Sequence, residues 1–99
     1  MSDKERNFIP NISIKAEQVL IGSVLLGLKP IADVKPQGFY VDLHKDIFNV
    51  AAQLFTAGQP IDLAAIIENC VKSKVFDKAE DAKLYLDALV NMAEQSAES

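Results

Sequence analysis

The chain has 99 residues, a length that suits one compact domain. Its hydrophobic fraction of 49%, with four glycines and four prolines, is typical of a globular protein and excludes a disordered or fibrous chain. The net charge is −4, and Arg6 is the only arginine among ten scattered basic residues. Because binding to a phosphate backbone depends on clustered Lys and Arg, this pattern argues against direct contact with nucleic acid. The acidic balance likewise argues against binding to anionic membranes.

The cysteine content and the first residues indicate the compartment. Cys70 is the only cysteine, so the chain has no intramolecular disulfide and fits a reducing environment. Residues 1–10 are polar and lack the apolar core of a secretion signal. The longest apolar stretch, residues 19–28, is too short to span a bilayer. We therefore expect a cytoplasmic protein.

A flexible leader is predicted for residues 1–11, followed by a helix that Ser13 caps and that runs to about Leu26. Gly27 supplies a left-handed position after the helix. We expect its core side to consist of small and apolar residues at helical spacing: Ala16, Val19, Leu20, Ser23, Val24 and Leu26. Apolar residues also cover most of the remaining circumference, so the helix is either central to the core or faces a partner as well. The candidate interface residues on this second side are Ile21, Leu25 and Leu28.

A short helix is predicted at residues 30–34, and Pro36 and Gly38 mark a loop. Asp42 is the expected cap of a second long helix, residues 43–57, which Gly58 ends. The apolar positions of this helix include Leu43, Ile47, Val50, Ala51 and Leu54. Phe48 and Phe55 lie seven residues apart on a neighbouring line and form a second candidate interface. Either candidate set is equally compatible with a place in the core.

Asp62 is the expected cap of a further helix, whose apolar face carries Ile66, Ile67, Cys70 and Val71. Asp77 and Glu80 resemble a capping box that opens a last helix through about Met92. The tail, residues 94–99, is predicted to fray. These elements predict an all-α bundle of about five helices over residues 12–93.

A near match to a phosphate-binding loop occurs at residues 22–29, where Gly22 and Gly27 have the required spacing. In that loop Lys directly follows the second glycine and Ser or Thr comes next. Here Lys29 comes one residue late and Pro30 follows it. The apolar residues between the glycines favour a helix, so we interpret Gly22 as a close packing position and Gly27 as a helix cap.

Acid–base chemistry at His44, the only histidine, is suggested by its neighbours Asp42 and Asp46. On a helix, however, His44 points about 160° away from each of them, given ~100° per residue. The favoured interpretation is a histidine in the first turn of a capped helix, partly packed against Phe39 and Tyr40. A small hydrolase using His44 or Cys70 is retained only as a minor hypothesis.

Cys70 has apolar neighbours and is interpreted as a small buried hydrophobic residue. One histidine and one cysteine, without carboxylates at ligand spacing, do not make a zinc site. The sequence therefore predicts no catalytic, cofactor-binding or metal-binding residues, and an interaction module is the default hypothesis.

Several segments in order resemble the N-terminal domain of DnaB-type bacterial replicative DNA helicases. Residues 16–26 are similar to the first helix of that domain, and Tyr85-Leu86 with Leu89 is similar to its "YL..L" helix. The region from Phe39 to Leu63 is similar to its "FY…H..IF…L…G.PID" run. The chain departs from the family at Lys15, where the family usually has Glu, and at residues 81–83, where a Gly-Gly pair is usual.

The resemblance implies a helical domain with a helical-hairpin dimerisation element, whose dimers build a collar on a hexameric helicase. It also implies docking of the helicase-binding domain of primase, and a helicase loader as a further partner. ATP and Mg²⁺ would bind to a separate motor domain. The tail, residues 94–99, would lead toward a linker helix that joins this domain to the motor. The alternative is a free-standing helical adaptor or regulator of the replication machinery. The sequence does not distinguish an excised domain from a complete short protein.

Overall fold

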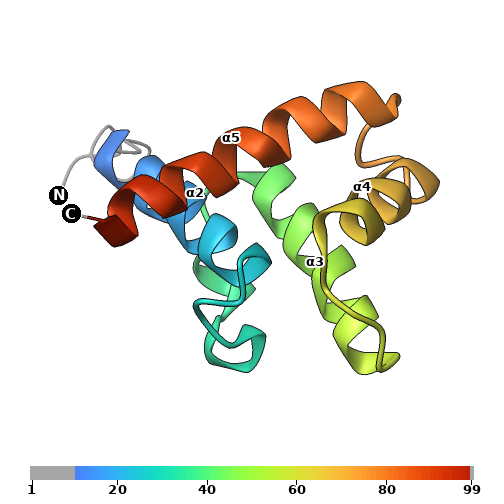
Figure 1. Cartoon of the computed structure of the whole chain (residues 1–99), viewed down its shortest axis with the longest axis horizontal. Coiled ribbons are helices and arrows are strands. Elements are labelled where there is room, and N and C mark those ends of the chain that lie inside the picture. Colours follow the sequence, from blue (N-terminus) through green and yellow to red (C-terminus); the bar gives the residue numbers. More distant parts are fainter. Residues whose placement is uncertain (1–10, 99) are drawn as a thin grey trace, which may run out of the picture.

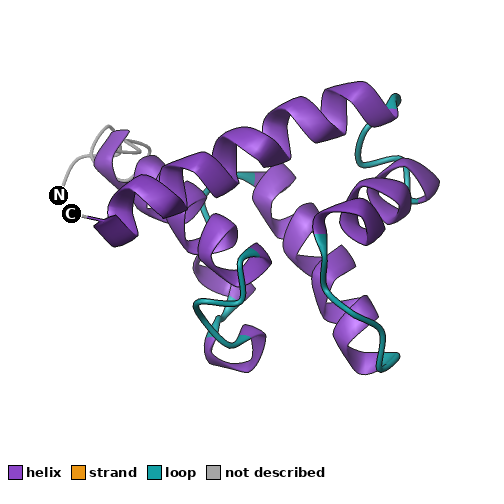
Figure 2. Ribbon diagram, in the orientation of Figure 1, coloured by secondary structure: helices purple, strands orange, loops and turns teal. Residues whose placement is uncertain are grey.

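The computed structural model describes residues 11–98. This part of the chain contains four α-helices and two short 3₁₀ turns, joined by loops. The helices are α2 (Asn11–Leu25), α3 (Asp42–Thr56), α4 (Leu63–Lys72) and α5 (Ala79–Glu98), and the turns are η1 (Ile31–Asp33) and η2 (Pro36–Gly38). Figure 2 shows no strand in this part of the chain. The all-α class is confirmed, with four helices instead of about five, because the element expected at residues 30–34 is a single 3₁₀ turn. The helical-hairpin dimerisation element stays a prediction.

The caps of two helices come from different sources. The Asp62 carboxylate accepts a hydrogen bond from the Ala65 N–H at 2.8 Å, which confirms Asp62 as the cap of α4. Asp42, in contrast, is the first residue of α3, and Val41 at the cap position makes no capping bond through its side chain. The expectation for Asp42 is therefore wrong. Asp42 still places a negative charge in the first turn of α3, and Glu17 of α2 adds a second one by accepting a hydrogen bond from the Val41 N–H.

The predicted starts of the first and last helices also need correction. Ser13 lies inside α2, since the chain is already helical at Asn11, so Ser13 is not a cap. The rest of the predicted leader, residues 1–10, lies outside the described residues. The last helix begins at Ala79, so Lys78 precedes it, and Asp77 is one residue too early to cap it. Both errors concern the first residue of a helix, which cap-forming residues in the sequence locate only approximately.

Three helices end in the same way, with one residue in the left-handed conformation. These residues are Gly27 (φ 77°), Gly58 (φ 74°) and Lys74 (φ 62°). The N–H that follows each of them bonds to the carbonyl five residues back, which closes the last turn: Leu28 to Ser23 at 2.9 Å, Gln59 to Leu54 at 2.9 Å and Val75 to Cys70 at 2.8 Å. The two predicted glycine caps are thus confirmed, and Lys74 adopts the same conformation without the freedom of glycine.

Replacing Lys74 with glycine is expected to stabilise the protein by about 0.5–1 kcal/mol. A left-handed conformation costs a residue with a Cβ about 1–2 kcal/mol, and the larger entropy of unfolded glycine offsets part of that gain. Urea denaturation measures the change. The matched reverse variant is Gly58→Ala, which should lower the free energy of unfolding by about 1 kcal/mol because alanine disfavours the left-handed conformation. An added Cβ at Gly58 meets no atom within 4 Å, so a steric clash does not add to this cost. A destabilised Lys74→Gly would show that the lysine side chain contributes more than its backbone costs.

Helices α2 and α5 form the most extensive contact between elements, and α5 continues across the molecule to pack on α4 (Figure 1). The crossing is close because Gly22 of α2 lies directly against the backbone of Leu89 on α5. Ala93, one turn further along α5, is also buried at this crossing. Since α2 packs against this second half of α5, the helix continues to Glu98 and does not end near Met92 as predicted.

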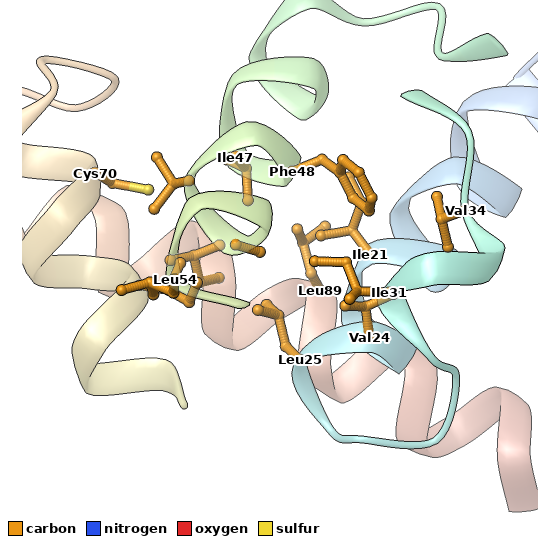
Figure 3. Close-up of a cluster of buried hydrophobic side chains, with 14 of the residues drawn as sticks. Ile21, Val24, Leu25, Ile31, Val34, Ile47, Phe48, Leu54, Cys70 and Leu89 are labelled. Atoms are coloured by element: carbon orange, nitrogen blue, oxygen red, sulfur yellow. The ribbon is translucent and has the colours of Figure 1, made fainter. Parts of the chain in front are cut away.

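The core lies where α2, α3 and α5 meet and extends between α3 and α4 (Figure 3). Cys70 of α4 points toward the side of α3 that carries Ile47, while Ile21, Val24 and Leu25 of α2 occupy the other half of the cluster. Phe39 and Phe48 meet edge to face, with ring centroids 5.7 Å apart. No helix within residues 11–98 is both long enough and apolar enough to cross a membrane.

Candidate interaction surface

The structure divides the five candidate interface residues into two groups. Ile21, Leu25 and Phe48 are buried within the chain and belong to its core, which is the alternative that the sequence left open. Leu28 and Phe55 are 60% and 56% exposed, and only these two lie where another molecule reaches them without unfolding the domain.

The core side of the first helix differs from the predicted one. Of the six residues expected there, only Val24 is buried, and Ala16 is exposed. The buried positions are instead Glu17, Ile21, Gly22 and Leu25, together with Val24. This side faces α5 because Gly22 allows the two backbones to approach closely. In a helix that is apolar nearly all round, periodicity alone does not select that side.

Large exposed hydrophobic residues occur at four places among the described residues: Leu28, Tyr40, Phe55 and Leu84. Leu84 is 75% exposed on the outer side of α5. Phe55 begins a run of six exposed residues that ends at Pro60 and forms the tip between α3 and α4. Exposed aromatic residues are enriched in protein–protein interfaces, so Phe55 is the strongest single contact candidate of the predicted set.

A buried polar cluster joins α2, α3 and α5. His44 of α3 is fully buried; its Nδ1 lies 2.7 Å from Oε1 of Glu17 on α2, and its Nε2 lies 2.5 Å from the hydroxyl of Tyr85 on α5. Glu17 also accepts hydrogen bonds from the N–H groups of Tyr40, at 2.7 Å, and Val41, at 3.1 Å. Gln18 donates to the Tyr85 hydroxyl at 3.3 Å. Every buried polar side-chain atom in the described part of the chain has a partner.

The donors around Glu17 assign the protons in this cluster. Two backbone N–H groups and His44 Nδ1 converge on the two oxygens of Glu17, which suits an ionised carboxylate that only accepts. With Nδ1–H donating to Glu17, Nε2 of a neutral imidazole accepts from the Tyr85 hydroxyl. The bonds therefore run in one direction, from Gln18 through Tyr85 and His44 to Glu17. The cluster holds the start of α3 against α2 and α5.

His44 does not act as an acid–base group with Asp42 or Asp46. Both aspartates are exposed, whereas both ring nitrogens of His44 are occupied by Glu17 and Tyr85 inside the fold. His44 is in the first turn of α3, as predicted, but it is completely buried rather than partly packed against Phe39 and Tyr40. A substrate has no access to the imidazole, so the cluster is structural.

Cys70 is fully buried, which confirms its interpretation as a small hydrophobic residue. Burial raises the pKa of the Cys70 thiol from 9.0 to about 11, so the thiol is protonated at neutral pH. Because the thiolate is the reactive form, Cys70 is not a nucleophile in this fold.

The near match to a phosphate-binding loop is part of a helix. Gly22 is buried against α5, Gly27 closes the end of α2, and the residues from Gly22 to Leu25 have no free N–H groups to surround a phosphate. Within residues 11–98, the His, Cys, Asp and Glu side chains form no group of three or more placed to hold a metal ion.

Comparison with known protein families matches residues 9–99 to the family described as "DnaB-like helicase N terminal domain". Among curated proteins, the replicative DNA helicase DnaB of Nostoc sp. is 33% identical over 64 residues, covering 61% of this chain and 7% of the relative. The replicative DNA helicase DnaB of Geobacillus stearothermophilus is 30% identical over 82 residues, covering 79% of this chain and 18% of the relative.

The replicative DNA helicase DnaB of Leifsonia xyli is 25% identical over 99 residues, covering 96% of this chain and 21% of the relative. The chain thus spans about a fifth or less of the length of these relatives. No solved structure matches it significantly. Because the family match extends over nearly all of its residues, the chain belongs to the family of DnaB-like helicase N-terminal domains.

Proposed function

We propose that the chain is a non-catalytic collar domain of a replicative DNA helicase, which self-associates and docks primase in the cytoplasm. The observation that carries this proposal is the family match over residues 9–99. The relatives named replicative DNA helicase DnaB support the place in DNA replication. ATP-dependent unwinding by a hexamer, with ATP and Mg²⁺, would then be the activity of the whole helicase and not of these residues.

The surface supports an interaction role more than a chemical one. The groups with potential chemistry, His44 and Cys70, are both fully buried. The exposed apolar residues include Leu28 and Phe55, which stand at the ends of α2 and α3. We propose that the tip from Phe55 to Pro60 contributes to the primase-docking surface, and that a helicase loader is a further partner of the collar. Apolar side chains in such tips bind by filling pockets on the partner.

The test is a calorimetric titration of the helicase-binding region of the cognate primase into the chain. We expect saturable binding in the range of tens of micromolar. Phe55→Ala should weaken binding about tenfold or more, which corresponds to about 1.4 kcal/mol, without changing the fold, because the ring is mostly exposed. Thr56→Ala, at the neighbouring exposed position, is the matched control and should bind as well as the unchanged chain.

Two outcomes would contradict this proposal. Primase docking by this domain is wrong if neither the chain nor the full helicase that contains it binds the primase region at about 100 µM, a concentration at which even weak transient contacts are detected. If binding occurs but Phe55→Ala and Thr56→Ala both bind normally, the primase site lies elsewhere on the domain.

A further inference from the structure

The outer side of α4 carries a shallow apolar groove. Its lining consists of Ala64, Ile67, Glu68, Val71 and Lys72 of α4 and Ala79 at the start of α5. The opposite side of α4 packs against the core, where Ile66 and Cys70 have no exposed surface. Helix α4 therefore presents apolar residues both to the core and to the outside. A surface helix of a small domain ordinarily has only the apolar face that packs on the core.

The charges along the groove are arranged so that one copy complements another. Glu68 and Lys72 lie one turn apart at the edge of the groove, with 3.3 Å between the carboxylate and the ammonium group. Both side chains are about two-thirds exposed, so either is free to exchange its partner for one on another molecule. In an antiparallel pair of identical helices the order of the charges is reversed, so that Glu68 of each copy faces Lys72 of the other.

We propose that this groove is a self-association surface, on which α4 of one copy packs antiparallel on α4 of a second copy. A two-fold axis between residues 69 and 70 brings Ile67 to within one residue, about 1.5 Å along the helix, of Val71 on the other copy. The same axis brings Glu68 equally close to Lys72, and both pairs occur twice. Ala64 and Ala79 have small side chains that let the two helices approach closely. The inference rests on the proposed self-association and assigns it to a particular face of the domain.

The size of the face sets the strength of the contact. Helix α4 has 10 residues and is about 15 Å long at 1.5 Å per residue. A pair of such helices buries less than the roughly 1,200 Å² at which stable specific interfaces begin, so the dimer is weak on its own. We expect a dissociation constant on the order of 100 µM, which matters once a larger assembly holds two copies close together.

The experiment is sedimentation equilibrium of the whole chain and of two single charge reversals, Glu68→Lys and Lys72→Glu. Each variant alone places like charges opposite each other across the two-fold axis, so its dimer should weaken about tenfold or more. An equimolar mixture should regain association, because a Glu68→Lys copy carries two positive charges on the groove and a Lys72→Glu copy carries two negative ones. The double variant, Glu68→Lys with Lys72→Glu, restores self-complementarity and should associate like the unchanged chain.

The matched control is the exposed ion pair of Asp42 and Lys45 on α3. Helix α3 packs on the core side of α4, away from the groove, so Asp42→Lys and Lys45→Glu should leave self-association unchanged. If the unchanged chain associates and both α4 variants associate equally well, the assignment to α4 is overturned while self-association stands. A chain that remains monomeric at about 1 mM overturns both the α4 assignment and the proposed self-association.

Discussion

Replacing Gly22 with alanine is expected to destabilise the protein by about 3 kcal/mol, the upper part of the range for overpacked cores. An added Cβ would lie 2.1 Å from the carbonyl oxygen and 2.7 Å from the carbonyl carbon of Leu89, and 2.9 Å from the Cβ of Ala93. Because the first two are backbone atoms of α5, they do not yield as a flexible side chain does, and α2 must move away from α5. Alanine favours a helix over glycine by only about 1 kcal/mol, which is too little to offset the cost of this clash.

Thermal denaturation followed by circular dichroism measures this effect, with an expected fall in melting temperature of more than about 10 °C for a domain of this size. Gly38→Ala is the control, since an added Cβ there meets no atom within 4 Å, and it should melt within a few degrees of the unchanged protein. Equal melting temperatures for the two variants would show that α2 and α5 do not cross as closely as described.

Replacing His44 with alanine is expected to cost about 3–5 kcal/mol, because it removes a hydrogen bond to the buried Glu17 carboxylate and leaves a cavity in the core. Glu17 would keep the hydrogen bonds from Tyr40 and Val41 but would lose the donor 2.7 Å from Oε1, although its side chain is only 4% exposed. Tyr85→Phe removes only the hydroxyl at the other ring nitrogen, so its cost should be smaller, about 1–2 kcal/mol.

A second substitution separates the charge of Glu17 from the cavity left by His44. Glu17→Gln removes the charge but keeps an acceptor for only one of the two backbone N–H groups, because these bond to different carboxylate oxygens. Its cost should be about 1 kcal/mol or more smaller in the His44→Ala background than in the unchanged protein, because the bond to His44 is already lost there. Urea denaturation of the single and double variants at neutral pH gives these values. A loss below about 1 kcal/mol for His44→Ala would mean that the cluster does not hold the three helices together.

Features set by a few neighbouring residues were predictable from the sequence. Gly27 and Gly58 end their helices because the left-handed conformation favours glycine, and Asp62 begins α4 because its carboxylate reaches an N–H three residues ahead. Gly22 was recognised as a close packing position, although its partner on α5 was not. Local chemistry thus established the class of the fold and most element boundaries.

Features that depend on distant residues were not predictable in this way. Glu17 and His44 are 27 residues apart, and nothing local shows that they meet. The available signal was indirect: one glutamate in a helix that is otherwise largely apolar, and one histidine in the whole chain. Their burial follows from the crossing of α2, α3 and α5, which periodicity does not provide.

The candidate interface shows the same limit. Ile21, Leu25 and Phe48 have the composition of either a core or an interface, and only the arrangement of the helices places them inside. The groove on α4 was not predictable either. The spacing of Ile67 and Val71 predicts a single apolar face shared with Ile66 and Cys70, and such a face would be used up by the core. In the fold Ile66 and Cys70 are fully buried, whereas Ile67 and Val71 are only partly buried and line the groove.

We propose that this domain works by association with other proteins, including its own copies. The most direct test is the solution mass of the chain by sedimentation equilibrium from about 10 µM to 1 mM, a range that brackets a weak dimer. We expect a weight-average mass that rises with concentration from 10.8 kDa toward twice that value. A mass of 10.8 kDa at every concentration would contradict it.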